Sequence, residues 1–263
     1  MARYQVIIAY DGTLFAGFQR QVRARTVQGE LEAALRQLGW QGRAILSAGR
    51  TDTGAHAQGN AAAFDLEWKH PAVELLGALN ALLPVDASIQ GLREAAADFH
   101  PRYHALWRHY RYQVVCLPVR NPLRERYAWR VWPAPDADAM GQAAALFVGW
   151  WDFAVFGSPT RPGGSTVREV FSSSWKAENG ELVYEVRANA FLYHMVRRLV
   201  ALQIKVGQGL LGREEIEAGL TSGKVQPPGL APAQGLCLME VGYPDPSRGG
   251  MPRIDRKQKV PDV

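Results

Sequence analysis

The chain is organised around one stretch, which reads Ala48-Gly49-Arg50-Thr51-Asp52-Thr53-Gly54-Ala55-His56-Ala57. An apolar run at residues 44–46 leads into it and is typical of a β-strand, while Gly49 and Gly54 bracket a polar centre. Alternate side chains of an extended chain share a face, so we expect Arg50 and Asp52 to point the same way. Such a pair could aim one carboxylate into a cleft. It could equally be a surface ion pair beside an Asp-x-Gly turn.

Around this stretch, the first 105 residues predict the order strand, helix, strand, strand, helix, strand. Thr26 is a plausible N-cap for the first helix, and Pro71 stands in the first turn of the second. The order is the split βαβ pattern of a ferredoxin-like half. The expected elements are a strand at 4–10, a helix from 27 to 38, strands at 44–46 and 61–66, a helix at 71–83 and a strand at 88–95.

The second half, residues 106–243, predicts a similar mixture of strands and helices. Residues 121–132 read as a basic, proline-flanked connection between the halves, and the chain is expected to turn near 150–153. Expected elements are strands at 106–115, 166–177, 181–190 and 236–241, with a hairpin turn at 178–180, and helices at 136–148, 191–207 and 213–220.

We therefore predict an α/β (α+β) fold. It has two ferredoxin-like halves, residues 1–105 and 106–243, with largely antiparallel sheets flanked by helices and an active-site cleft between them. Residues 244–263 are rich in Pro, Gly, Lys and Arg, and we expect this tail to be disordered.

The charge of the chain favours an acidic partner. The net charge is +5, the isoelectric point is about 9.3, and 24 of the 30 basic residues are arginine. The planar guanidinium group suits phosphates and base edges, so nucleic acid is the favoured partner. A GC-rich genome could produce the same arginine bias.

The remaining composition is that of an ordinary globular protein. Cys116 and Cys237 lie in apolar runs without partners at metal-binding spacing, which indicates reduced thiols in the cytoplasm. The first residues enter a strand directly, so no signal peptide is expected. The longest apolar run, residues 143–156, is interrupted by Gly149 and Asp152, and we expect no membrane segment.

No cofactor or metal is expected. Histidines 56, 100, 104, 109 and 194 lack the spacing of a metal site, and no glycine-rich phosphate loop opens a helix. A phosphate-transferring aspartate usually needs a second carboxylate for magnesium, whereas residues 50–57 supply only Asp52. Cofactor-free chemistry therefore fits these residues best.

Four motifs resemble the tRNA pseudouridine synthase A family, and the resemblance covers roughly residues 3–243. They are GRTDTGAHA at 49–57, YDG with FAGFQRQ at 10–21, FHPR at 99–102 and the R-x-Y-x-Y strand at 108–112. The resemblance implies an isomerase that converts uridine to pseudouridine at positions 38–40 of the tRNA anticodon stem-loop. It also implies a cytoplasmic homodimer in which one tRNA contacts both subunits.

The same resemblance implies the catalytic residues. Asp52 matches the catalytic nucleophile, which acts at C1′, C6 or C2′ of the nucleoside, three alternatives that the sequence leaves open. Arg50 would keep Asp52 ionised and fill the space of the extruded base. Tyr110 would lie against the target base, and Arg197 matches the basic residue that pairs with the catalytic aspartate. Without the resemblance, Tyr110 reads as a core aromatic and Arg197 as a solvated helix position.

Residues expected to bind the substrate are Tyr110, Arg20, Arg23, Arg25, His56 and Arg102. The arginines at 20–25 could instead belong to a solvated loop. The chain departs from the family pattern at Thr53, where alanine is frequent, and at Asn60, where glutamine is common. These two changes bear on substrate choice and not on the reaction.

Two other functions remain open from the sequence. A non-catalytic tRNA-binding protein or chaperone need not keep Arg50, Asp52, Tyr110 and Arg197 together. An aspartyl-phosphate enzyme would depend on magnesium.

Overall fold

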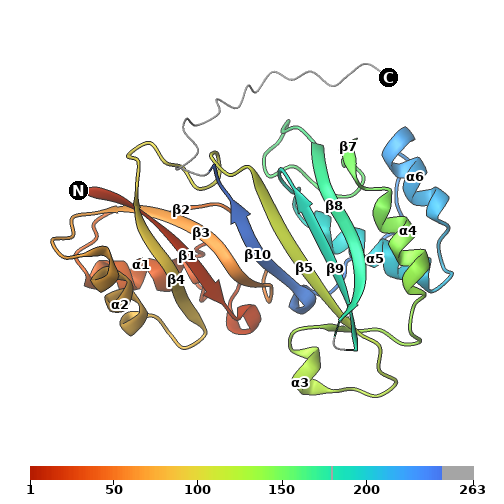
Figure 1. Cartoon of the computed structure of the whole chain (residues 1–263), viewed down its shortest axis with the longest axis horizontal. Helices are drawn as coiled ribbons and strands as arrows, with labels where there is room; N and C mark the ends of the chain where they lie inside the picture. The colour runs from red at the N-terminus through yellow and green to blue at the C-terminus, as the bar shows by residue number, and fades with distance from the viewer. Residues whose placement is uncertain (179, 245–263) are drawn as a thin grey trace.

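A computed structural model describes residues 1–178 and 180–244, in which ten strands join in one mixed sheet (Figure 1). Asn179, in the expected hairpin turn, lies outside the described residues, as does the tail from residue 245. Within the described part, no helix is both long enough and apolar enough to span a membrane.

The N-terminal half has the predicted order of elements. Strand β3 pairs antiparallel with β1, which pairs with β4, and β2 runs along the other edge of β3. This gives the ferredoxin-like order β4-β1-β3-β2. The Oγ1 of Thr26 accepts a hydrogen bond from Gly29 N at 3.2 Å and caps α1, as predicted. The elements are β1 (Ala2–Tyr10), η1 (Gly12–Leu14), α1 (Val27–Gln37), β2 (Leu46–Ser47), β3 (His56–Leu66), α2 (Ala72–Leu82) and β4 (Ala87–Ala95).

The C-terminal half repeats this arrangement. Its strands follow the order β10-β5-β9-β8, the same as in the first half, with β7 added beyond β8. The elements are β5 (Trp107–Val115), α3 (Pro122–Glu125), β6 (Trp129–Arg130), α4 (Ala137–Ala145), β7 (Gly149–Asp152), β8 (Val167–Glu178), β9 (Glu181–Ala188), α5 (Met195–Gly207), α6 (Arg213–Ser222), η2 (Ala233–Gly235) and β10 (Leu236–Gly242).

Strand β10 joins the two halves into one sheet. It pairs parallel with the first residues of β3, placing Cys237 opposite His56 and Leu238 opposite Ala57. On its other side it pairs antiparallel with β5. In Figure 1 it runs between the two sets of strands. The central stretch, residues 48–57, therefore lies at the junction of the halves.

Three local predictions were wrong. Residues 150–153 do not turn, because Trp150 and Trp151 pair with Glu169 and Arg168 as strand β7. The helix expected from residue 191 begins at Met195. Residues 121–132 do not connect the halves, because they follow β5 within the second half, where they form helix α3 and strand β6, which pairs with the end of β5. Each difference depends on contacts with distant parts of the chain, which local patterns do not report.

Candidate active site

The loop between β2 and β3 presents the central carboxylate. Residues 48–55 do not pair as a strand, but Arg50 and Asp52 line the same cavity, so the expectation that they point the same way is confirmed. Ala55 N donates to Asp52 O at 3.1 Å, and Gly54 takes a φ of 79°. A glycine adopts this left-handed backbone without steric cost. The loop thus turns directly after the carboxylate.

Buried polar groups fix this loop from beneath. The Tyr10 hydroxyl lies 2.8 Å from Thr51 Oγ1, and Asn60 Nδ2 donates to Gly49 O at 3.0 Å. At Gly17, an added Cβ would lie 2.8 Å from Thr51 O, so the first loop approaches closely. Asn60 is fully buried and therefore positions the loop from inside the protein.

Asp52 forms an ion pair with a residue 145 positions away. Arg197, in the first turn of α5, donates from Nη1 to Asp52 Oδ2 at 2.6 Å, and from Nε to Ala231 O at 2.7 Å. His194 Nε2 lies 3.4 Å from the same Oδ2. The side chains of Asp52 and Arg197 are 19% and 13% exposed. The pairing expected of Arg197 is present, and charge-assisted bonds of this kind are strong.

Arg50 does not hold Asp52. Its side chain is exposed, and among residues 1–178 and 180–244 it makes no hydrogen bond or ion pair. It still lines the cavity in front of Asp52. The ion pair between Arg50 and Asp52 is therefore absent although both side chains line the same cavity, and Arg197 takes the place of Arg50 as the partner of Asp52.

Tyr110 lies on β5 beside the same cavity. It is 9% exposed, and its ring meets that of Phe191 edge to face, with centroids 5.0 Å apart. Burial raises the pKa of Tyr110 to about 12, although Arg108 opposes the shift. The phenol is therefore protonated at neutral pH.

A cavity of about 1120 Å³ opens between the two halves. A recess of about 60 Å³ at its wall brings together Arg50, Asp52, Tyr110 and Arg197. In the described part of the chain, Asp52 is the sole carboxylate that lines either space. The basic residues around it are Arg50, Arg102, Arg108, Arg168, Arg197, His100 and His194.

Three of these arginines, Arg102, Arg108 and Arg168, form a cluster. Arg108 is 8% exposed and donates to the carbonyls of Asn189 and Arg102 at 2.8 and 2.7 Å. Burial lowers the pKa of Arg108 and of Arg168. Repulsion from Arg102 contributes to lowering the pKa of Arg108, and repulsion from Arg102 and Arg108 contributes to lowering the pKa of Arg168. No carboxylate of residues 1–178 or 180–244 forms an ion pair with the cluster, so its positive potential is available to an anionic ligand.

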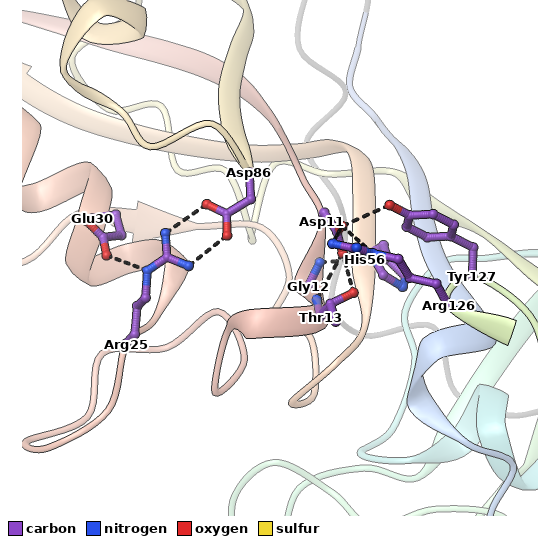
Figure 2. A network of polar contacts seen from close by, with 9 residues as sticks. All are labelled: Asp11, Gly12, Thr13, Arg25, Glu30, His56, Asp86, Arg126 and Tyr127. Atoms are coloured by element: carbon purple, nitrogen blue, oxygen red, sulfur yellow. Dashed lines mark hydrogen bonds and ion pairs between the residues drawn. The ribbon is translucent and has the colours of Figure 1, made fainter. Parts of the chain in front are cut away.

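The arginines expected at the first loop are mostly engaged in the fold. Arg25 donates to both carboxylate oxygens of Asp86 at 2.7 Å and to Glu30 at 2.9 Å (Figure 2). Arg20 pairs with buried Glu32. Arg23 is exposed and is absent from the cavity lining. Of the expected basic contacts, only Arg102 lies on the cavity, where it donates to Thr160 Oγ1 at 3.0 Å.

His56 also lies away from the cavity. It is 7% exposed, and its Nδ1 accepts a hydrogen bond from Gly12 N at 3.0 Å (Figure 2). Burial lowers its pKa, while neighbouring Asp11 acts in the opposite direction. Asp11 accepts hydrogen bonds from Arg126 and Tyr127 of the second half at 2.8 and 2.9 Å. His56 thus belongs to a network that links the halves, and it does not line the cavity.

Residue patterns missed three members of the site. His194 was considered only as a metal ligand, although its position three residues before Arg197 could have suggested a shared helix turn. Arg108 shares a strand face with Tyr110 but is not among the site residues expected from the motifs. No pattern in the sequence marks Arg168. Among the described residues, no group of three His, Cys, Asp or Glu side chains is placed to hold a metal ion.

Comparisons with known proteins identify the family of this chain. A family model described as tRNA pseudouridine synthase matches residues 143–244. "tRNA pseudouridine synthase A" of Geobacter sp. (strain M21) is 40% identical over 93% of this chain and 100% of that protein. The proteins of the same name from Syntrophotalea carbinolica and Thermus thermophilus are 40% and 42% identical, over 92% and 93% of this chain and 97% and 98% of their own lengths. This chain belongs to the tRNA pseudouridine synthase A family.

Proposed function

We propose that this protein isomerises uridine to pseudouridine in tRNA, with Asp52 as its nucleophile or base. The observation that carries the proposal is the placement of Asp52. It is the one carboxylate among the described residues that line the cavity, and the other charged or titratable nitrogen groups of that lining belong to arginine and histidine. A polyanionic strand is attracted to such a surface, and the lone carboxylate is then the group left to act on the nucleoside.

The chemistry needs no co-reactant, because the product is an isomer of the substrate. The N1–C1′ bond breaks, the base turns over, C5 bonds to C1′, and the proton lost from C5 is balanced by one gained at N1. The target base has to leave its stack to reach the site. Arg197 holds the Asp52 carboxylate in place, and Tyr110 offers a ring and a protonated hydroxyl at the recess.

The finer assignments extend this proposal. We propose that the target uridines are those at positions 38–40 of the anticodon stem-loop, that the enzyme acts in the cytoplasm, and that it works as a homodimer with one tRNA contacting both subunits. Residues 1–105 and 106–243 are proposed as its two halves. The presence of cavity residues from both halves supports this division.

The test is to incubate transcribed tRNA with the protein and map pseudouridine by mass spectrometry. Wild-type protein should convert uridine in the anticodon stem-loop, and EDTA should not prevent conversion of prefolded tRNA. Asp52→Asn should abolish conversion while tRNA still binds, since phosphate contacts supply most of the affinity. Asp52→Asn turning over at the wild-type rate would refute the proposed role. A strict magnesium requirement would favour the aspartyl-phosphate alternative.

A further inference from the structure

His194 has an unusual backbone conformation. Its φ is 63°, and no other non-glycine residue within 1–178 and 180–244 has a positive φ. A left-handed backbone is disfavoured for a residue with a side chain. Such conformations persist when surrounding contacts enforce them, and they cluster at functional sites. The left-handed backbone of His194 therefore suggests that its imidazole has a function at this position.

Contacts on both sides of His194 hold this conformation. Tyr193 N donates to Ser158 O at 2.9 Å, and Ser158 N donates to Tyr193 O at 3.3 Å. On the other side, Arg198 N donates to His194 O at 3.0 Å and begins α5. The expected helix start at residue 191 is prevented by this anchoring, and His194 becomes the residue at which the chain enters the helix.

The imidazole lies beside the carboxylate of Asp52. His194 Nε2 lies 3.4 Å from Asp52 Oδ2, a contact that is close but not a hydrogen bond, and the same oxygen accepts a hydrogen bond from Arg197. Among the described residues, no hydrogen bond reaches Asp52 Oδ1. The imidazole stacks on the Tyr193 ring at 3.6 Å and is 22% exposed, at the border of both the cavity and its recess. One carboxylate oxygen thus faces two nitrogen groups, and the other is available.

We propose that His194 is a positioning residue for Asp52: together with Arg197 it orients Oδ2, so that Oδ1 is the oxygen presented to the nucleoside. The inference rests on the proposed function. The charged groups that face the imidazole are Asp52, Arg197 and Arg198, and burial is the largest influence on its pKa, which is lowered. At neutral pH the ring is therefore uncharged and can offer one N–H to Oδ2 without adding a second cation beside the carboxylate.

Two substitutions separate this role from a structural one. His194→Gly keeps the left-handed backbone at no steric cost but removes the imidazole. His194→Gln restores an amide N–H on a side chain of similar length. The readouts are the single-turnover rate of pseudouridine formation, the Kd for tRNA and the melting temperature.

His194→Gly should lower the single-turnover rate by roughly ten- to a hundredfold, since small displacements of a catalytic group have effects of this size. Its Kd for tRNA should stay within about twofold, because phosphate contacts dominate affinity. The single-turnover rate of His194→Gln should be about tenfold higher than that of His194→Gly. If the glycine variant melts lower, the glutamine variant is compared with His194→Leu, which keeps bulk without the N–H.

A glycine variant as fast as wild type would overturn the inference, as would a glutamine variant no faster than the leucine variant. Asp52→Asn is measured alongside. An inactive Asp52→Asn with a fully active His194→Gly keeps the proposed function and rejects only the role of His194. A wild-type protein that forms no pseudouridine rejects the proposed function itself.

Discussion

Arg197 and Asp52 form the pair that joins the two halves at the cavity: Nη1 donates to Oδ2 at 2.6 Å across 145 residues of sequence. Arg50, two residues from Asp52, makes no such contact among the described residues. The carboxylate is therefore oriented by helix α5 of the second half and carried by a loop of the first. Relative movement of the halves would change the geometry of the reacting group.

Arg197→Met should test this dependence. Removing one partner of a part-buried charged hydrogen bond leaves the carboxylate unpaired and should cost about 1–3 kcal/mol of stability. The single-turnover rate should fall by roughly a hundredfold or more, the effect of a misplaced catalytic group. Pseudouridine formation and thermal melting measure the two effects.

Arg50→Met is the control for this variant. Its exposed side chain contacts nothing that holds the fold, so the melting temperature should match wild type. An Arg197→Met protein with the wild-type rate and melting temperature would mean that the ion pair between Arg197 and Asp52 contributes neither to catalysis nor to stability.

The arginine cluster should supply phosphate contacts. Arg168→Gln should weaken tRNA binding and make the slope of log affinity against log salt about 1 unit shallower, as expected when one phosphate contact is lost. Filter binding over a salt series measures the slope. Arg213→Gln on α6, which is absent from the cavity lining, is the matched control and should leave the slope unchanged.

The wild-type slope should be roughly −3 or steeper if about five phosphates are contacted. Arg20, Arg25, Arg124 and Arg126 are each ion-paired within the protein, so they are poorer candidates for these contacts than the cavity arginines. A slope near zero would show that the cavity arginines do not meet the RNA backbone.

Asp11 should stabilise the contact between the halves in a pH-dependent way. Burial by itself raises its pKa, but hydrogen bonds from Thr13, Tyr127 and Arg126 outweigh burial and hold the pKa well below its usual range. A carboxylate whose pKa is depressed in the folded state stabilises the protein at pH values above its pKa in the unfolded state, which is about 4. This stabilisation is lost as the pH falls through the pKa of the folded state. Asp11→Asn should thus lower the free energy of unfolding by about 1–3 kcal/mol at pH 7.

Urea unfolding at several pH values measures this contribution. The difference between wild type and Asp11→Asn should shrink steadily below about pH 4. Asp98→Asn, at an exposed position, should show little difference at any pH. A constant difference between wild type and Asp11→Asn down to pH 2 would mean that the carboxylate charge is not responsible.

The order of elements could be predicted because it depends on local signals. Thr26 and the periodic apolar positions after it define α1, and the strand patterns define both ferredoxin-like halves. The parallel pairing of β10 with β3 could not be predicted, because it joins segments that lie about 180 residues apart. The left-handed His194 is equally invisible, since Ser158 enforces it through the backbone of Tyr193.

The site was predictable only where motifs resemble a family. Asp52, Tyr110 and Arg197 were named from such motifs, and the structure brings them to one recess. Sequence patterns did not show that Arg25 and His56 are bound within the protein, because the partners of a loop arginine or a motif histidine cannot be identified from the sequence around it. Asp86 and Gly12, which engage these two side chains, lie 61 and 44 positions away.

Tyr110 gives the last test, and the structure changes what it should show. Loss of the C5 proton needs an acceptor, but burial raises the pKa of Tyr110 to about 12. A phenol with that pKa is ionised in only about one molecule in 10⁵ at pH 7. If phenolate is the acceptor, the rate of proton removal should rise about tenfold for each pH unit between 7 and 9, because the phenolate fraction does.

Tyr110→Phe keeps the ring and its edge-to-face contact with Phe191 but loses the hydroxyl. We expect unchanged tRNA affinity, a rate lowered roughly a hundredfold or more, and no alkaline rise. Tritium release from tRNA carrying 5-tritiated uridine, followed in single turnover, measures the step. A Phe variant within about threefold of wild type would limit the contribution of the hydroxyl to under about 1 kcal/mol, and Tyr110 would then act by stacking alone. Weaker tRNA binding together with the slower rate would instead indicate that the hydroxyl supports the position of β5, because a proton-transfer group affects the rate and not the affinity.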